Sequence, residues 1–117
     1  MLWVANILVL IVAFLHIAFL ALEMFFWDHP VGRRQFGLTP EFAKESATLA
    51  ANQGLYNGFL AAGLIWGLMI DSTPIKNFFL LCVLVAGIFG GVTAKRSILY
   101  IQALPALLAL IAVYLSR

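Results

Sequence analysis

Three polar side chains interrupt the first hydrophobic segment of the chain, and their spacing places them on one helical face. Asn6, His16 and Glu23 are 10 and 7 residues apart, so in an α-helix they point into one sector of about 100°. Ionisable groups at membrane depth are costly and often mark function, and a carboxylate there can act as a general acid or base. For His16 we favour an interhelical hydrogen bond. For Glu23, an ion pair with Arg33 or Arg34 is as plausible as a binding role.

A second set of polar residues lies where a later hydrophobic segment begins. Asn52, Gln53, Tyr56 and Asn57 enter the membrane on the side where the first segment leaves it, so they are expected at the depth of Glu23. Because these side chains cover more than one helix face, they predict a polar pocket that opens to the cytoplasm. The alternative is that polar residues only mark helix entrances on the wetter side.

The last two hydrophobic segments add polar groups at the same membrane face. Lys95 and Arg96 connect these segments, and Gln102 follows one turn into the last of them. Pro105 has no backbone N–H, so the carbonyl of Ile101 is expected to be unpaired beside Gln102. Nearly all polar groups at membrane depth are thus expected in one leaflet.

An amphiphilic or anionic small molecule is the predicted ligand of this pocket. Its head would meet Arg33, Arg34 or Arg96, and its tail would lie among the helices. Glu23 and Tyr56 are the candidate catalytic groups, as acid or base and as donor. A small multidrug-type transporter and an accessory structural subunit are the alternatives, and whether the protein is an enzyme stays open. The candidate ligand-binding residues are His16, Glu23, Arg33, Arg34, Asn52, Gln53, Tyr56, Asn57, Arg96 and Gln102.

Composition assigns the chain to the membrane-protein class. Its 117 residues are 64% hydrophobic and 10% charged, with a mean hydropathy of +1.05, whereas soluble domains are about half apolar and about a quarter charged. The net charge of +2 is too small for a nucleic-acid surface. Cys82 is the single cysteine, and His16 and His29 are the only histidines. We therefore predict no metal site of standard ligand spacing and no cofactor.

Four segments are long and apolar enough to cross a bilayer, which takes about 20 residues in a helix. The first has no Lys or Arg before Arg33, so we expect a retained helix and not a signal peptide. Thr39-Pro40-Glu41 is typical of a helix start, so the second helix is expected to begin in the cytoplasm. The predicted fold is all-α, a single transmembrane domain folded as a four-helix bundle. Its helices are predicted at 2–27, about 40–70 (membrane part 49–69), 75–94 and 97–115, with a loop at 28–46.

Basic residues near the helix ends predict the orientation of the chain. Five lie on one side and two on the other, which favours both termini outside and the 28–46 loop in the cytoplasm. The expected location is the bacterial cytoplasmic membrane. The five are Arg33, Arg34, Lys44, Lys95 and Arg96, and the two are Lys76 and Arg117.

Pairs of small residues four positions apart predict close helix packing. We favour packing within one bundle over a dimer interface. Both are compatible, and a homo-oligomer, dimer or trimer, is expected because four short helices enclose little space for a pocket. The pairs are Gly54 with Gly58, Gly63 with Gly67, Ala86 with Gly90 and Gly87 with Gly91.

Several of these residues carry a resemblance to a known family. His16, the run 23–27 and above all the string 52–63 resemble domain-of-unknown-function family 1304, a group of small bacterial and fungal membrane proteins. The resemblance extends to Gln102 and Pro105 and covers nearly the whole chain. It implies a four-helix membrane protein and brings no particular activity.

A second resemblance, in architecture only, is to the membrane-associated eicosanoid and glutathione metabolism (MAPEG) proteins. Those are four-helix chains that form trimers and hold glutathione at the cytoplasmic side between subunits. The stretch from Asn52 to Asn57 corresponds to their polar entry to the second helix, but no arginine precedes Asn52 and no glutamate precedes Asn57. This resemblance implies a membrane transferase that uses glutathione.

Overall fold

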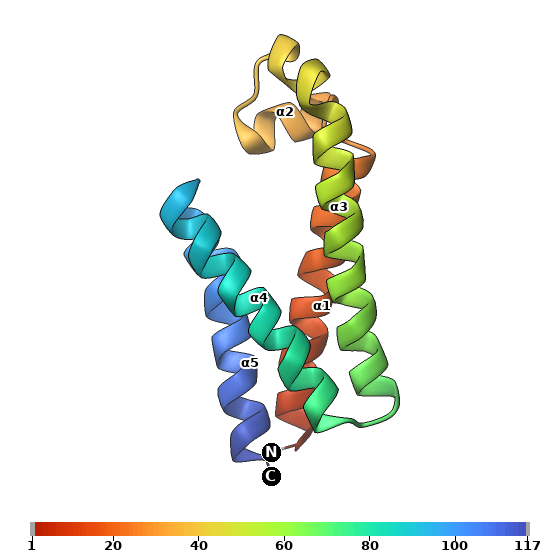
Figure 1. The fold of residues 1–117 in the computed structure, drawn as a ribbon, viewed down its shortest axis with the longest axis vertical. Coiled ribbons are helices and arrows are strands. Elements are labelled where there is room, and N and C mark those ends of the chain that lie inside the picture. The colour runs from red at the N-terminus through yellow and green to blue at the C-terminus, as the bar shows by residue number, and fades with distance from the viewer. Residues whose placement is uncertain (1, 117) are drawn as a thin grey trace. The chain divides into compact units, whose positions relative to one another are not determined.

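The regular structure of the described residues, 2–116, is entirely helical in the computed structural model (Figure 1). The predicted all-α class is therefore confirmed. Arg117, which we counted toward the orientation of the chain, lies outside the described residues. The elements are α1 (Leu2–Met24), α2 (Pro30–Phe36), α3 (Pro40–Met69), α4 (Thr73–Thr93), the π-helix η1 (Leu99–Ala103) and α5 (Leu104–Leu115).

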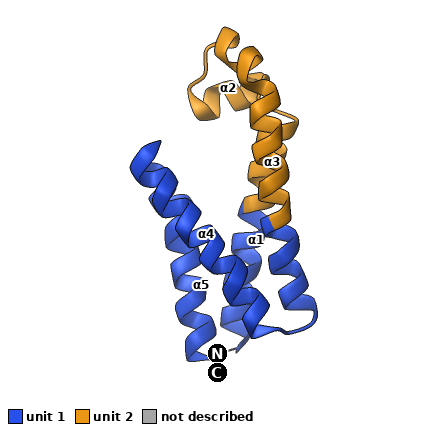
Figure 2. Cartoon of the chain, in the orientation of Figure 1, with its two compact units in different colours: residues 1–15, 60–117 blue, residues 16–59 orange. Residues whose placement is uncertain are grey.

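The chain divides into two compact units (Figure 2). Unit 1 comprises residues 1–15 and 60–117, which include the start of α1, the end of α3, and all of α4, η1 and α5. Unit 2 comprises residues 16–59, which include the rest of α1, all of α2 and most of α3. We describe each unit by itself.

Small apolar side chains form the core of unit 1. Buried positions recur every three or four residues along its helices, so each helix contributes one narrow face to the core. Helix α4 packs against η1 and α5, and Gly87 makes this contact close: a Cβ atom there would lie 2.6 Å from the backbone nitrogen of Ala103. The buried core residues are Ala5, Val9, Val12, Ala13, Leu64, Leu80, Val83, Ala106, Ala109, Ala112 and Val113.

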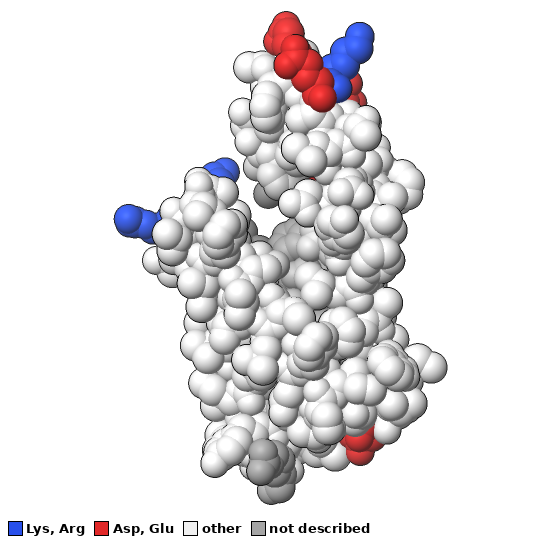
Figure 3. Space-filling model, viewed as in Figure 1, with Lys and Arg blue, Asp and Glu red and all other residues white. Residues whose placement is uncertain are grey.

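The outward faces of unit 1 are strongly apolar. Phe78, Val85 and Phe89 on α4 are each more than 60% exposed, and the face in Figure 3 carries few charged side chains between the helix ends. Leu2–Met24 and Thr73–Thr93 are long and apolar enough to cross a membrane, although only 28% and 22% of their most apolar stretches are buried. A core helix of a soluble protein would be mostly buried, so these two helices have the length, composition and exposure of membrane spans.

The remaining two predicted spans do not meet the same criteria of length and composition. The apolar stretch 99–115 is shorter than a typical span, and it opens with the π-helix η1. Helix α3 has 30 residues and carries several polar side chains, so it is not among the helices that composition alone marks as spans.

In unit 2, a short helix replaces part of the predicted 28–46 loop. Pro30 occupies the first turn of α2, and His29 Nδ1 accepts a hydrogen bond from the Val31 backbone N–H at 3.2 Å. The helix ends at Gly37, whose φ of 65° is the left-handed conformation that glycine adopts most easily. These capping groups explain why a stretch that resembles a turn forms a helix.

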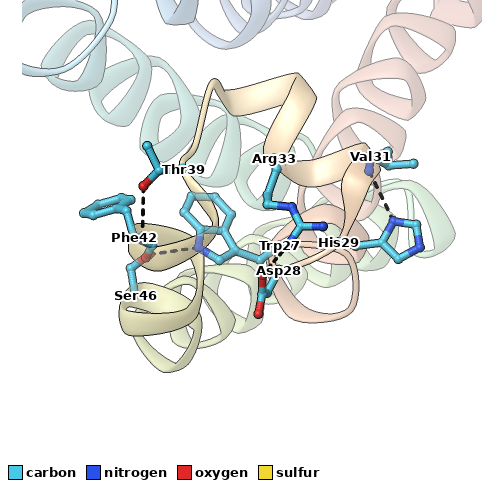
Figure 4. Close-up of polar contacts among 8 residues, drawn as sticks. All are labelled: Trp27, Asp28, His29, Val31, Arg33, Thr39, Phe42 and Ser46. Atoms are coloured by element: carbon cyan, nitrogen blue, oxygen red, sulfur yellow. Dashed lines mark hydrogen bonds and ion pairs between the residues drawn. The ribbon is translucent and has the colours of Figure 1, made fainter.

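Residues before and after α2 in the chain contact one another and hold the helix in place (Figure 4). Trp27 Nε1 donates a hydrogen bond to Ser46 Oγ at 3.0 Å, and the Trp27 ring lies 4.9 Å from that of Phe36. Helix α3 then begins at Pro40, where Thr39 Oγ1 accepts from the Phe42 N–H at 3.2 Å. The observed start of α3 coincides with the start that the Thr-Pro-Glu sequence predicts.

Candidate functional site

A carboxylate on α1 and an amide on α3 meet in unit 2. Glu23 and Asn57 are both half-buried, and Asn57 Nδ2 donates a hydrogen bond to Glu23 Oε1. The two helices bring these side chains together although 34 residues separate them in the chain. This half-buried polar contact between two helices makes Glu23 and Asn57 the candidate site.

Two glycines on α3 make this meeting possible. A Cβ atom at Gly54 would lie 3.1 Å from Glu23 Cβ and 3.2 Å from the Leu20 carbonyl oxygen, and at Gly58 it would lie 2.6 Å from Leu20 Cδ1. The Gly54 and Gly58 pair therefore lets α3 approach α1 within this chain. This use agrees with packing inside one bundle, the interpretation that we favoured.

The ion pair considered for Glu23 is not formed. Arg33 Nη1 instead pairs with Asp28 Oδ1 at 3.0 Å (Figure 4). The arginine and lysine side chains of unit 2 form one ion pair, that of Arg33 with Asp28. Arg34 is exposed on α2. Glu23 thus has an amide partner and, within unit 2, no cationic partner.

His16 lies on the same helix as Glu23 and is fully buried. Its imidazole ring meets the ring of Phe19 edge to face, with the centroids 5.2 Å apart. Its side chain has no exposed surface, and the interhelical hydrogen bond that we favoured for it stays a prediction.

Three other predicted site residues lie on the exposed surface of α3. Asn52, Gln53 and Tyr56 all face outward, and the Tyr56 ring lies 6.1 Å from that of Phe59. No contact joins Tyr56 to Glu23 in the described structure, so of the entry residues of α3 only Asn57 is brought to the carboxylate. A catalytic pairing of Glu23 with Tyr56 remains a prediction.

The last two candidates belong to unit 1. Arg96 is exposed between α4 and η1, and Gln102 is half-buried within η1. The Leu104 N–H bonds to the Leu99 carbonyl, five residues back, so the chain widens into a π-helix just before Pro105, which cannot donate. π-Helices of this kind often occur at functional sites.

A polar cluster that sequence reasoning missed lies in unit 1. Lys76, counted above among the basic residues near the helix ends, has a side chain only 1% exposed. Its Nζ donates to Asn6 Oδ1 at 3.0 Å and to Asp71 Oδ1 at 3.1 Å. A Lys and an Asp five residues apart around the turn at Pro74 were the available signal, but the burial of Lys76 depends on α1, which is distant in the chain.

The outer face of α4 carries a shallow apolar groove of about 610 Å³. None of its lining residues is a predicted site residue, so the groove and the Glu23–Asn57 pair are separate features. The groove is lined by Phe78, Leu81, Cys82, Val85, Ala86 and Phe89.

The fold and the polar pair together define an all-helical protein with helices of membrane-spanning character and one half-buried carboxylate–amide contact. The chain belongs to the family described as "Protein of unknown function (DUF1304)", which it matches over residues 10–114. It is 31% identical over 109 residues to uncharacterized protein YpaA of Lactococcus lactis subsp. lactis (strain IL1403), covering 90% of this chain and 92% of the relative. No solved structure matches the chain.

Proposed function

We propose that this protein is an integral membrane protein that binds an amphiphilic small molecule at a site built around Glu23 and Asn57. The observation that carries the proposal is the half-buried Glu23 carboxylate, which receives a hydrogen bond from Asn57 but has no cationic partner within unit 2. A charged group is costly at such a position. A role in ligand binding is a reason for the protein to keep the Glu23 carboxylate at this position.

The proposed architecture has four membrane crossings. At about 1.5 Å per residue, the 30 residues of α3 reach about 45 Å, enough to cross the hydrocarbon core and extend beyond it. The 17 residues from Leu99 to Leu115 lie at the lower limit of a spanning helix, about 17 residues. With α1 and α4, these segments give the four helices predicted from the sequence.

The proposed orientation places α2 in the cytoplasm and both termini outside. Lys76 lies on the predicted outer side but is buried and paired with Asp71, so it contributes little free positive charge there. The exposed basic residues Arg34, Lys95 and Arg96 lie on the predicted cytoplasmic side. This distribution supports the positive-inside assignment.

Unit 2, which carries the pair, exposes both apolar and polar side chains. Phe25, Leu55 and Phe59 are large apolar side chains with more than 40% of their surface exposed, and the exposed amides of Asn52 and Gln53 lie on the same stretch of α3. A ligand with an apolar body and a polar head would satisfy both kinds of surface.

A structural role in a larger complex is the second candidate function. It is favoured by His16, which is fully buried, because a polar side chain enclosed in this way holds helices in register. On this alternative the Glu23–Asn57 bond would also serve only to align α1 with α3.

Native mass spectrometry of the gently extracted protein tests the proposal. We expect a discrete small-molecule adduct on the wild-type protein and on Glu45→Gln, whose carboxylate is exposed on α3 in the same unit. The adduct should be absent from Glu23→Gln. An adduct that is retained in Glu23→Gln, or a wild-type protein that carries none, would favour the structural alternative.

A further inference from the structure

The two charged groups that lie inside the helical units have different sets of partners. The Lys76 ammonium in unit 1 has both an amide partner, Asn6, and a counterion, Asp71. The Glu23 carboxylate in unit 2 has an amide partner, Asn57, and no counterion within its unit. The group that is missing at Glu23 is a cation.

The arginine and lysine side chains of unit 2 are not placed to supply that charge. Arg33 is held by Asp28 at 3.0 Å. Arg34 and Lys44 are exposed, and neither is within 4.0 Å of the Glu23 carboxylate. An amide hydrogen bond stabilises a carboxylate but leaves its negative charge in place.

We propose that the ligand of the Glu23–Asn57 site carries a cationic head group on an apolar body. This inference rests on the proposed function and reverses the charge that the sequence alone suggested for the ligand, because Arg33 is already neutralised. A positive head group would give Glu23 a counterion beside its amide partner, as Lys76 has in unit 1.

Two probes of nearly equal size and opposite charge test this inference. Equilibrium binding of tetraphenylphosphonium and tetraphenylborate is measured on the full chain in nanodiscs of zwitterionic lipid, with empty nanodiscs as the background. We expect saturable binding of tetraphenylphosphonium to the wild type and to Glu45→Gln, weakened about tenfold or more in Glu23→Gln. Tetraphenylborate should bind no better than to empty nanodiscs.

The outcomes separate this inference from the proposed function. Saturable binding of tetraphenylborate in place of tetraphenylphosphonium would overturn the cationic assignment and leave a ligand site in place. If neither probe saturates, the cationic assignment fails, and native mass spectrometry decides on the site independently. Charge selectivity in the wild type needs no variant, and Glu23→Asp, which keeps the carboxylate, should retain that selectivity if Glu23→Gln does not fold.

Discussion

Unit 1 and unit 2 each hold a charged side chain among apolar helices, but they satisfy it in different ways. Lys76 in unit 1 is 1% exposed and reaches an amide and a carboxylate, with Nζ 3.1 Å from Asp71. Glu23 in unit 2 is half-buried and reaches the Asn57 amide. A buried charge with a purely structural role needs a counterion as well as an amide partner, and Lys76 has both. Glu23 has an amide partner alone, which leaves a place for a charged ligand.

The energetics of buried charge explain why this difference matters. Removing one partner of a buried pair costs several kcal/mol, because the remaining charge is left without compensation. A charged group that never had a counterion can be neutralised with little loss of stability. Substitutions at the two positions should therefore have unequal effects on stability and on ligand binding.

The largest expected effect is that of Asp71→Asn. Asparagine tolerates the positive φ of 51° at this position, so the change removes charge without straining the backbone. Lys76 is then buried without a counterion. Because the Asp71 side chain is itself 67% exposed and solvent screens part of the attraction, we expect a loss of about 2–3 kcal/mol in the free energy of unfolding in detergent micelles. The matched control is Asp28→Asn, because its partner Arg33 is 31% exposed and an exposed pair contributes about 1 kcal/mol or less. Equal losses in the two variants would show that the burial of Lys76 has no energetic role.

A smaller effect is expected when the approach of α1 to α3 is obstructed. In Gly54→Ala the new Cβ would lie 2.6 Å from Met24 Cγ, 3.1 Å from Glu23 Cβ and 3.2 Å from a backbone oxygen. The Met24 side chain must move and α1 and α3 must shift slightly, at a cost of about 1–3 kcal/mol. In the control Gly58→Ala the Cβ meets only the end of the Leu20 side chain, which can move. Alanine also favours the helix by about 1 kcal/mol over glycine, so this control should be nearly neutral in the same unfolding measurement. A Gly54→Ala protein as stable as Gly58→Ala would mean that the helices are not in close contact at Glu23.

The smallest effect on stability is expected from Glu23→Gln. The glutamine carbonyl can accept the same Asn57 N–H, and no cation in unit 2 loses its partner, so the free energy of unfolding should change by less than about 1 kcal/mol. A loss as large as that of Asp71→Asn would assign Glu23 a structural counterion and remove the contrast between the two units. The same micelle unfolding assay measures all these variants on one scale.

Local sequence signals predicted much of the helical structure. Long apolar runs placed α1 and α4, and the Thr39-Pro40-Glu41 signal placed the start of α3. Helix α2 was missed because Pro30 and Gly32 suggest a turn, whereas a histidine cap at His29 stabilises a helix. The π-helix before Pro105 was also not predicted, although the disruptive effect of that proline was.

The candidate site could be predicted only in part. The predicted membrane depth of the polar residues put Glu23 level with residues 52–57, and the structure joins it to Asn57. Membrane depth could not show which face of α3 turns toward α1, so exposed Tyr56 was grouped with Asn57. The sequence also carried no sign that Lys76 is buried, since its burial depends on contacts such as that with Asn6, 70 residues away.

Infrared difference spectroscopy of the Glu23 carboxylate tests the central claim most directly. The protein carries a ¹³C label at its glutamate carboxyl groups, and spectra are compared before and after tetraphenylphosphonium is added. The account predicts a change in the carboxylate band that is present in the wild type, absent in Glu23→Gln and absent when tetraphenylborate replaces the cation. A wild-type band that does not change at saturating tetraphenylphosphonium would contradict the claim that this carboxylate receives a cationic ligand.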